Sequence, residues 1–496
     1  MIVLPSRATT AAHRNCRFIF LTSIASMAMI VSAFAFTALP IYAAPPAQGA
    51  LPAFPGAEGW GRNAKGGGQN SKTQVLMVTS LEDSGPGTLR EALKARGPRI
   101  VVFKTGGVID LKGKLTIQAG DLTVAAQTAP GDGVIVKSFP IRIAANNVIM
   151  RGFRIRPGDG PGPKGDLRDG IQLGNADGTQ IHDVIVDHCS FGWCMNETAE
   201  FWYGCRNMTM SYCVLSEALW KSKHPKGTHG YAMLLGDAAN DQVTISHNLF
   251  AHNERRNPWV KMNAKCELIN NVIYNYASEA TGLWLGEPKP AADGTARPAP
   301  KPCFVNLIGN TYKRGEALAK QKIPKRPIGL GKIPAPGSRF YIHDNIGYGR
   351  TDGKQDDWDA VEAGQFDVAP YRAKEPLTEA ASGMTPQKAA EGYETVLKHA
   401  GSYPRDKADA RAAEDTRTTG GKHLDALSEI GGYPAYAVGT PPPDADNDGI
   451  PDDWERAHNL NPNDKSDATK LAASGYLNIE EYINSLIPLP EAASKP

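Results

Sequence analysis

The sequence predicts an all-β fold of the right-handed, single-stranded parallel β-helix type. Short runs rich in β-branched residues recur between residues 183 and 276, and aligning them places Cys189, Cys213, Asn248 and Asn271 in one column. The two cysteines are 24 residues apart and the two asparagines are 23 apart. A repeat of this length, with two or three strand-sized pieces, is typical of a solenoid whose coils bury one another. Asn310 and Asn345 continue the same column.

The composition also favours strands joined by tight turns. The 496 residues include 51 Gly and 37 Pro, which suit turns better than helices. Lys and Arg number 54 and Asp and Glu 52, so the formal net charge is only +2. This balance indicates no particular polyanionic partner, and we expect no nucleic-acid binding. Any electrostatic attraction of a ligand must come from local clusters.

The first 44 residues read as a secretory signal peptide. Three arginines precede an apolar run over residues 18–38, and the small residues Ala43 and Ala44 follow it. We therefore expect a secreted protein, extracellular or periplasmic, without a membrane association after cleavage. An uncleaved anchor is the alternative, because the apolar run is long enough to span a bilayer.

Residues 50–350 are predicted to form the solenoid. Thr88 is placed to N-cap a short helix through Leu93, which we expect to cover the N-terminal end of the coils. Strands are expected at residues 99–103, 122–126, 133–136, 141–144 and 148–155. A Gly/Pro-rich loop at 156–168 and a basic insertion at 220–229 interrupt the coils, and both are expected on one side.

Six cysteines remain after the signal peptide. Export permits disulfides, and Cys194 with Cys205 is one possible pair. Cys189 and Cys213, one coil apart, are better interpreted as stacked core thiols. The pairing is left open.

The end of the chain divides into two further parts. Residues 351–440 are charged, rich in Ala and weakly periodic, and we expect a tail with one helix near 389–400 packed on the solenoid. Residues 441–488 are predicted to form a small module that binds Ca²⁺. Its loop spaces oxygen ligands as an EF-hand loop does, with Gly449 at the sharp turn. The expected ligands are Asp444, Asp446, Asp448, the carbonyl of Ile450, Asp452 and Glu455. It resembles EF-hand or thrombospondin type 3-like calcium modules.

A second constellation lies on the predicted coils. Acidic and amide residues gather at Asp169, Asn196, Glu197 and Glu200. Basic residues follow on the adjoining coils at Lys226, Arg255, Arg256 and Lys261. Since neighbouring coils are about 4.8 Å apart, the two groups can share one groove. Such a groove suits a polyanion bridged by a divalent cation.

These segments resemble the pectate lyases of the parallel β-helix class. The resemblance rests on VIVDHCSF at 184–191, residues 196–211, RNPWVK at 256–261 and INNV at 269–272. The loop at 224–229 is similar to that of the pectate trisaccharide-lyase branch. Two positions depart from the family pattern. Asn196 stands in place of an acid, with Glu197 beside it, and Tyr231 stands in place of a lysine, whose role we expect Lys226 to take.

The resemblance implies β-elimination on polygalacturonate. Asp169, Glu200 and either Asn196 or Glu197 would hold Ca²⁺, and Arg256 would remove the C5 proton. Lys226 would assist, while Lys261, Arg255 and His224 would bind substrate. An arginine base implies an alkaline optimum, because its pKa ordinarily exceeds about 12. The enzyme is expected to be a monomer.

Other interpretations remain open from the sequence alone. A hydrolase on the same fold would need paired carboxylates at the scissile bond. A protein with an inert groove would be a carbohydrate-binding adhesin, and a pectin lyase would need no calcium. Asp187 and His188 look catalytic, but a structural role is favoured, with Asp187 bonding turn amides and His188 packing in the stack. His224 and His229 could be surface residues. The tryptophans that could stack on sugars are Trp193, Trp202, Trp220 and Trp259.

Overall fold

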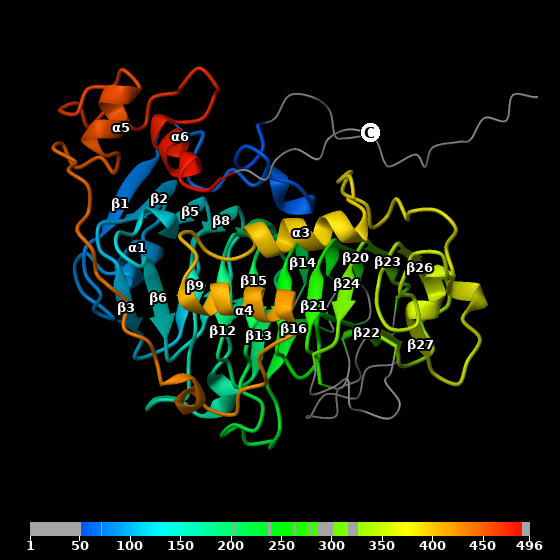
Figure 1. The fold of residues 1–496 in the computed structure, drawn as a ribbon. Coiled ribbons are helices and arrows are strands. Elements are labelled where there is room, and N and C mark those ends of the chain that lie inside the picture. Colours follow the sequence, from blue (N-terminus) through cyan, green and yellow to red (C-terminus); the bar gives the residue numbers. More distant parts are fainter. Residues whose placement is uncertain are drawn as a thin grey trace, which may run out of the picture. The chain divides into compact units, whose positions relative to one another are not determined.

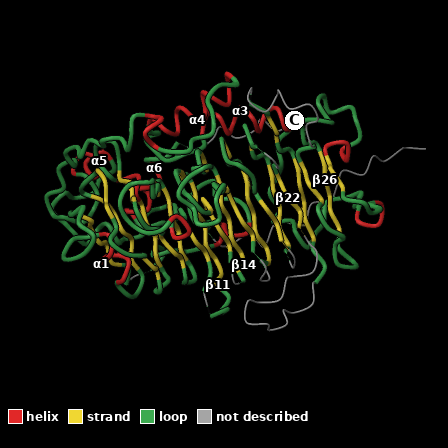
Figure 2. Tube along the Cα trace, turned by 90° about the horizontal axis from the view of Figure 1, so that it is seen from below, coloured by secondary structure: helices red, strands yellow, loops and turns green. Residues whose placement is uncertain are grey.

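A computed structural model describes residues 51–488 of the chain, apart from 71, 176, 203, 237–239, 262–263, 278–279, 285–300 and 316–325. The predicted signal peptide and its alternative, a membrane anchor, lie outside these residues. Within the described residues, three parallel sheets stack their strands one coil above the next (Figures 1 and 2). None of the described helices combines the length and the apolarity needed to span a bilayer. The predicted parallel β-helix is confirmed.

The central coils each contribute one strand to each sheet, and each sheet follows chain order. The first sheet contains β1 (Gln74–Val78), β2 (Arg99–Phe103), β5 (Leu122–Ala125), β8 (Val148–Arg151), β11 (Ile181–Asp187), β14 (Cys205–Ser211), β17 (Asp241–Ser246), β20 (Lys265–Ile269), β23 (Phe304–Ile308) and β26 (Arg339–His343). The second contains β4 (Leu115–Ile117), β7 (Ile141–Ile143), β10 (Ile171–Leu173), β13 (Glu197–Phe201), β16 (Tyr231–Leu235), β19 (Trp259–Lys261), β22 (Thr281–Trp284), β25 (Ile328–Leu330) and β27 (Val361–Ala363). The third contains β3 (Gly107–Asp110), β6 (Val134–Lys137), β9 (Arg154–Ile155), β12 (Ser190–Gly192), β15 (Val214–Ser216), β18 (Leu249–Ala251), β21 (Val272–Tyr274) and β24 (Thr311–Lys313).

A ladder of buried asparagine side chains holds the coils in register. The Nδ2 atom of Asn248 donates to Oδ1 of Asn271 at 3.0 Å, Asn271 donates to Asn310 at 2.9 Å, and Asn310 donates to Asn345 at 2.8 Å. Each Oδ1 also accepts the backbone N–H of the preceding member, as Asn271 does from Asn248 at 3.0 Å. Cys213 joins the ladder through its backbone N–H. The column predicted from the spacing is therefore a hydrogen-bonded column.

The cysteines and aromatic residues fill neighbouring columns. All six cysteines of the described chain are buried free thiols, so Cys194 and Cys205 form no bridge. His188 stacks on Tyr212 at 4.9 Å and Tyr212 on His247 at 4.8 Å.

The expectation that Asp187 bonds turn amides is wrong, because its partners among the described residues are side chains. It accepts from Arg151 at 3.0 Å and Ser211 at 2.7 Å and contacts His188 at 2.6 Å, which makes it a buried link between coils.

The first coils differ from the sequence prediction in that β3 and β4 lie where no strand was expected and that one expected strand is divided. The run at 148–155 is two strands, β8 and β9, because Gly152 adopts a φ of 69° that turns the chain from one sheet to the next. The expected capping helix is α1 (Leu89–Lys94), and Thr88 accepts a hydrogen bond from the backbone of Glu91. Its residues Leu89 and Leu93 are buried in the solenoid core.

Two helices from the predicted tail lie along the coils (Figure 1). These are α3 (Ala389–His399) and α4 (Lys407–Thr418), and their apolar faces pack on strands β15, β18 and β21. Before them, β27 continues the second sheet beyond the expected limit at residue 350.

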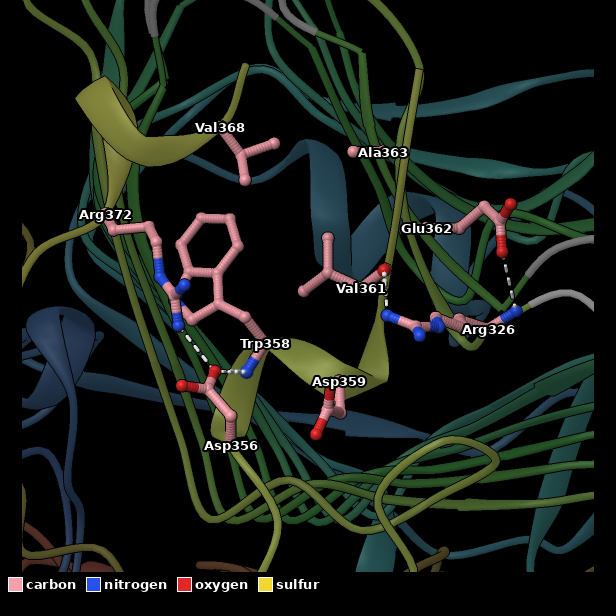
Figure 3. Close-up of a pocket in the computed structure, with 9 residues that line it drawn as sticks. All are labelled: Arg326, Asp356, Trp358, Asp359, Val361, Glu362, Ala363, Val368 and Arg372. Carbon is pink, nitrogen blue, oxygen red and sulfur yellow. Dashed lines mark hydrogen bonds and ion pairs between the residues drawn. The ribbon is translucent and has the colours of Figure 1, made fainter. Parts of the chain in front are cut away.

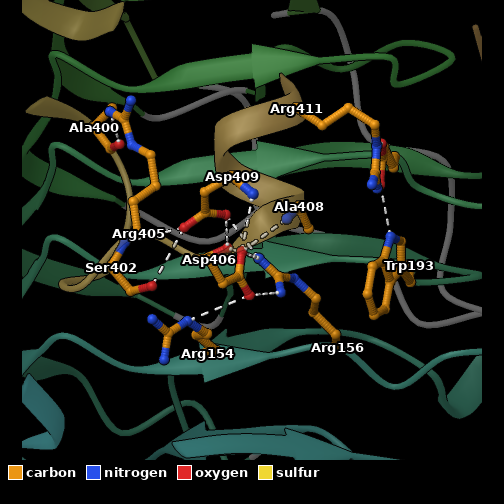
Figure 4. A network of polar contacts seen from close by, with 12 residues as sticks. Arg154, Arg156, Trp193, Ala400, Ser402, Arg405, Asp406, Ala408, Asp409 and Arg411 are labelled. Carbon is orange, nitrogen blue, oxygen red and sulfur yellow. Dashed lines mark hydrogen bonds and ion pairs between the residues drawn. The ribbon is translucent and has the colours of Figure 1, made fainter. Parts of the chain in front are cut away.

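Buried charges attach α4 to the solenoid (Figure 4). Arg156 ion-pairs with Asp406 and, at 2.7 Å, with Asp409, and Arg154 pairs with Asp406 at 3.4 Å. On the next turn of the helix Arg411 pairs with Glu217 at 2.7 Å. These ion pairs, together with the apolar contacts, join α4 to the coils that carry Arg154, Arg156 and Glu217.

The asparagine ladder leads to a stability prediction. Asn271→Ala removes the acceptor of the Asn248 N–H and the donor to the Ile245 carbonyl, leaving buried polar groups unpaired. We expect the free energy of unfolding to fall by at least about 2 kcal/mol, measured by urea denaturation. The exposed Asn463→Ala should change it by less than about 0.5 kcal/mol. Equal effects of the two substitutions would contradict a structural ladder.

Candidate active site

The candidate site lies on the second sheet, where parallel register aligns residues from successive coils. Arg142 of β7 pairs in register with Gln172 of β10, Gln172 with Glu200 of β13, and Glu200 with Leu234 of β16. Leu234 pairs in turn with Trp259 of β19. Residues distant in sequence therefore occupy adjacent positions on one face.

Three carboxylates meet on this face. One ligand atom each of Asp169, Glu197 and Glu200 lies within 4.8 Å of the others. Asp169 precedes β10, and its Oδ1 accepts the Asn196 amide at 2.8 Å and the Glu197 backbone N–H at 3.2 Å. The Asn196 amide now donates to Asp169, and half a turn of that amide presents its oxygen to the same space. The oxygen-only donor set fits a calcium ion.

Burial and mutual repulsion act on these acids. Burial raises the pKa of Asp169 well above its usual range, and the charges of Glu200 and Glu197 raise it further. Burial and the neighbouring Glu197 raise the pKa of Glu200 to about 7. Burial also raises the pKa of Glu197, against the opposing effect of Arg256. Such a cluster favours either a proton or a bound cation.

The basic side of the site begins at Arg256. Its guanidinium ion-pairs with Glu197, two coils away, and lies 4.3 Å from the ring centre of Tyr231 and 4.4 Å from that of Trp259. Its backbone has a φ of 62°, an uncommon conformation for a side-chain-bearing residue that often marks functional positions. Burial lowers the pKa of Arg256, while Glu197 raises it.

The other predicted basic residues surround Arg256. Arg255 donates to the Tyr231 hydroxyl at 2.5 Å, and Nζ of Lys261 lies 5.6 Å from the Trp202 ring centre. Lys226 is exposed on the basic insertion, and both Lys226 and Lys261 act electrostatically on Glu197. The acidic and basic predicted residues of the groove thus come together.

The histidines of the insertion are not surface residues. His224 and His229 are buried, their rings stack at 3.8 Å, and His229 lies 3.8 Å from the Tyr231 ring. This ring stack continues to Tyr231, the residue that stands where the family has a lysine. Gly165 of the Gly/Pro-rich loop leaves no room for a side chain beside the His224 backbone, so the two loops are adjacent as expected.

The structure adds residues that the sequence interpretation missed. The Gln172 amide donates to Asp169 at 3.0 Å and to Glu200 at 2.7 Å, while its oxygen accepts from Arg142. Lys114, just before β4, acts electrostatically on Asp169 and Glu200. Alternation places Gln172 and Arg142 outward, but nothing in their local sequence marks them as partners of an acid cluster.

The tryptophans divide into two groups. Trp193 is buried and donates to Glu217 at 2.7 Å, so it is a packing residue. Trp220 lies 5.0 Å from the His423 ring. Trp202 and Trp259 are half-buried beside Lys261 and Arg256 and are available to a sugar ring.

A cavity of about 480 Å³ opens at the other end of the second sheet, around β27 (Figure 3). Its charged residues pair among themselves, since Arg372 donates to Asp356 at 2.5 Å and the Arg326 backbone donates to Glu362 at 3.3 Å. It lies three strands beyond β19 and contains none of the predicted site residues.

The predicted calcium loop at 444–455 forms a second acidic cluster. Ligand atoms of Asp444, Asp446 and Asp448 lie within 4.8 Å of one another. Asp448 and Glu455 lie within the same distance of Asp467, a residue that the sequence interpretation did not include. Asp452 is outside both groups and accepts the Ala445 N–H at 2.8 Å. Ile450 is buried next to the cluster.

Comparison with known proteins identifies relatives along most of the chain. The probable pectate lyase C of Neosartorya fischeri is 33% identical over 444 residues, covering 88% of this chain and 94% of that protein. The protein of the same description from Aspergillus oryzae is 33% identical over 443 residues and covers 88% and 95%. The Emericella nidulans protein is 30% identical and covers 90% and 95%. No family model matches the chain.

Comparison with solved structures finds weaker likenesses. Jun a 1, the major cedar pollen allergen, has a TM-score of 0.49 and 17% identity, covering 70% of this chain and 92% of its own. A pectate lyase from Bacillus sp. N165 in complex with trigalacturonate has a TM-score of 0.44 and 14% identity, covering 70% and 99%.

The raised pKa of Glu200 predicts a pH-dependent stability in chelator. In the folded protein Glu200 has a pKa of about 7 and loses its proton around that pH, whereas in the unfolded chain it ionises near its ordinary pKa of about 4.3. The folded state therefore holds more protons between these values, and its stability decreases as the pH rises through that window.

Glu200→Gln removes this titration. We expect the unfolding midpoint of the unmodified protein to fall more steeply than that of Glu200→Gln between about pH 5 and about pH 8, measured by thermal scans in EGTA. Parallel curves would show that Glu200 ionises normally in the folded protein.

Proposed function

The chain belongs to the pectate lyase family, and on that premise we propose that it is a secreted, calcium-dependent enzyme that cleaves α-1,4-polygalacturonate by β-elimination. Relatives described as pectate lyases match it at 33% identity over most of both chains, so it is a polysaccharide lyase. The products would be 4,5-unsaturated oligogalacturonides. The expected signal peptide, Met1 to Ala44, supports secretion.

One contact carries the proposal, the ion pair that joins the acid cluster to the basic cluster. Glu197 belongs to the three-carboxylate group and also pairs with Arg256. A cation bound by the acid cluster and a base in the basic cluster would thus be close enough to act on the same sugar. Neither an adhesin nor a solvated surface explains why buried like charges are assembled opposite two arginines.

The metal-binding residues in this proposal are Asp169, Glu200 and either Glu197 or Asn196. Burial raises the pKa of all three carboxyl groups, and the Asn196 amide lies beside them. Together these groups provide the oxygen ligands that Ca²⁺ prefers. Bound calcium supplies positive charge that pairs with the uronate carboxylate and makes its C5 proton more acidic. Gln172, bonded to both Asp169 and Glu200, orients these ligands.

Arg256 is the proposed base. Its neutral guanidine would take the C5 proton, the released electron pair would form the C4–C5 double bond, and the C4–oxygen bond of the glycosidic link would break. Water would protonate the departing oxygen. Burial and the neighbouring Arg255 lower the pKa of Arg256, but Glu197 opposes them, so an alkaline optimum is still expected.

The remaining basic residues would bind and position the substrate. Lys226, Lys261 and Arg255 supply positive charge around Arg256 for neighbouring uronate carboxylates. His224 is buried, so in this proposal it acts through its ring stack under Tyr231 and by accepting the Lys226 backbone N–H at 3.1 Å. Trp202 and Trp259 are placed to contact sugar rings.

The C-terminal residues 441–488 would form a separate calcium module. Asp444, Asp446, Asp448, Ile450, Asp452 and Glu455 keep the ligand spacing of an EF-hand loop. We propose that residues 50–350 carry the lyase activity and that the tail at 351–440 supports the coils.

Hydrolysis is the alternative reaction on this fold. Hydrolases place their two carboxyl groups about 5 to 9.5 Å apart around the scissile bond. Here three carboxylates, and not a pair, each place one oxygen within 4.8 Å of the others, an arrangement that favours a shared cation. Absorbance of an unsaturated uronide during digestion of polygalacturonate distinguishes the reactions, since hydrolysis yields reducing ends without it.

Arg256→Ala should abolish elimination. Loss of a positioned base costs about 10² to 10⁴-fold in rate, and here it also removes a charge next to the substrate. The assay follows ultraviolet absorbance of the unsaturated product from about pH 7 to about pH 10, with circular dichroism as the check on folding. Arg206→Ala, an exposed arginine of β14 in another sheet, is the control and should keep full activity. An active, folded Arg256→Ala protein would exclude Arg256 as the base.

Lys114 offers a test of how far the substrate groove extends. Lys114→Ala should raise the KM for polygalacturonate by about three- to tenfold with little change in kcat, because it removes a positive charge at the acidic end of the groove, several coils from the proposed base Arg256. The matched control is Lys112→Ala, since Lys112 is also exposed but pairs with Asp110 at 2.9 Å. Equal KM values for both variants would place the substrate elsewhere.

A further inference from the structure

The C-terminal module is packed on the first coils of the solenoid. Its helices are α5 (Asp452–Ala457) and α6 (Asn478–Ser485), which Figure 1 shows next to β1, β2 and β5. Ile450, Leu477, Ile479 and Ile483 share one buried apolar cluster with Ile100, Val102 and Ala125. The module thus covers the outer face of the strands at which the coils begin.

Polar contacts fix the same interface. Gln127 of the solenoid donates to the Ile483 carbonyl at 3.1 Å, and the Gln69 N–H donates to Glu480 at 3.2 Å. Lys104, between β2 and β3, ion-pairs with Asp444 of the acidic loop. Gly449 has a φ of 101°, and a Cβ there would lie 2.9 Å from Val75. The acidic loop is therefore seated directly on the solenoid.

The acids of this loop are buried without enough partners. Asp448, Glu455 and Asp467 are exposed by only 1%, 0% and 4%. Within the described residues, neither Glu455 oxygen has a hydrogen-bond partner, and the same holds for both oxygens of Asp446, for Oδ2 of Asp448 and for Oδ1 of Asp467. Buried carboxylate oxygens are normally paired, because leaving them unpaired costs several kcal/mol.

Asp467 comes from a different segment than the other acids. It lies between α5 and α6, in a loop without the repeated aspartates of a calcium loop. Its Oδ2 accepts the Asn461 N–H at 3.0 Å, which directs its other oxygen to the space shared with Asp448 and Glu455. The cluster therefore joins both helical halves of the module.

We propose that Asp446, Asp448, Glu455 and Asp467 bind one calcium ion that closes the two halves of the module and fastens them to the first coils of the solenoid. The inference rests on the calcium module proposed above and revises its ligands, because Asp444 pairs with Lys104 and Asp452 accepts the Ala445 N–H, while Asp467 joins the cluster. It is independent of the lyase reaction. The ion supplies two positive charges to four acids that otherwise repel one another beside the interface. Without it, the module loosens and the outer face of β1 and β2 becomes accessible to solvent.

The test uses the full mature chain. Calcium binding is measured by isothermal titration, and hydrogen exchange of β1, β2 and α6 is followed by mass spectrometry in EGTA and in CaCl₂. We expect calcium to slow exchange in all three elements, and Asp467→Asn to weaken calcium binding at this site by at least about tenfold. Asp464→Asn, on the same loop but paired with Lys470 at the surface, should bind calcium normally.

Two outcomes would overturn the proposal. One is equal calcium affinity of Asp467→Asn and Asp464→Asn, and the other is exchange in β1 and β2 of the unmodified chain that calcium does not change. The exchange measurement uses only the unmodified chain, so it tests the proposal even if Asp467→Asn fails to fold. Glu200→Gln separates the two calcium sites, because it should lose lyase activity and keep calcium-dependent protection of β1, β2 and α6.

Discussion

The register between stacked coils is the constraint on which the rest of the molecule depends. A parallel coil places every side chain next to its counterpart about 4.8 Å away on the following coil. The ladder from Asn248 to Asn345 repeats one hydrogen-bond geometry across four coils and leaves no freedom for a shift by one residue. Asp169, Glu200 and Arg256 are far apart in sequence, and they meet only because that register is kept on the opposite sheet.

Within that frame, Glu197 links the two halves of the site. It is close enough to Asp169 and Glu200 to share a cation and close enough to Arg256 to hold the guanidinium charged. These two roles compete for one negative charge. Whatever neutralises Glu197 removes the interaction that raises the pKa of Arg256, while burial and Arg255 continue to lower it. In the proposed mechanism, cation binding by the acid cluster and loss of the proton from Arg256 would therefore be coupled through Glu197.

The sequence predicted the features that repeat and missed those that depend on a single contact. The asparagine column and the strand at 99–103 follow from periodicity, which any stacked solenoid must satisfy. The run at 148–155 looked continuous because apolar residues lie on both sides of Gly152, and only its backbone angle shows a corner. Gln172 and Asp467 carry no motif, so their approach to other acids could not be derived without coordinates. His224 and His229 looked exposed in a basic loop, yet they stack against each other beneath Tyr231.

The two acidic clusters differ in how the protein itself satisfies them, and this difference bears on their roles. At Asp169 and Glu200, the amides of Asn196 and Gln172 donate to the carboxylates, and Arg256 pairs with Glu197. The carboxylates of that cluster have hydrogen-bond and ion-pair partners within the protein. The cluster could therefore persist without a calcium ion and release or rebind one during turnover. At Asp448, Glu455 and Asp467, buried oxygens have no such donors among the described residues. Since no donor among the described residues pairs with these oxygens, an ion bound there would stabilise the fold, whereas an ion bound at the first cluster would act on the substrate.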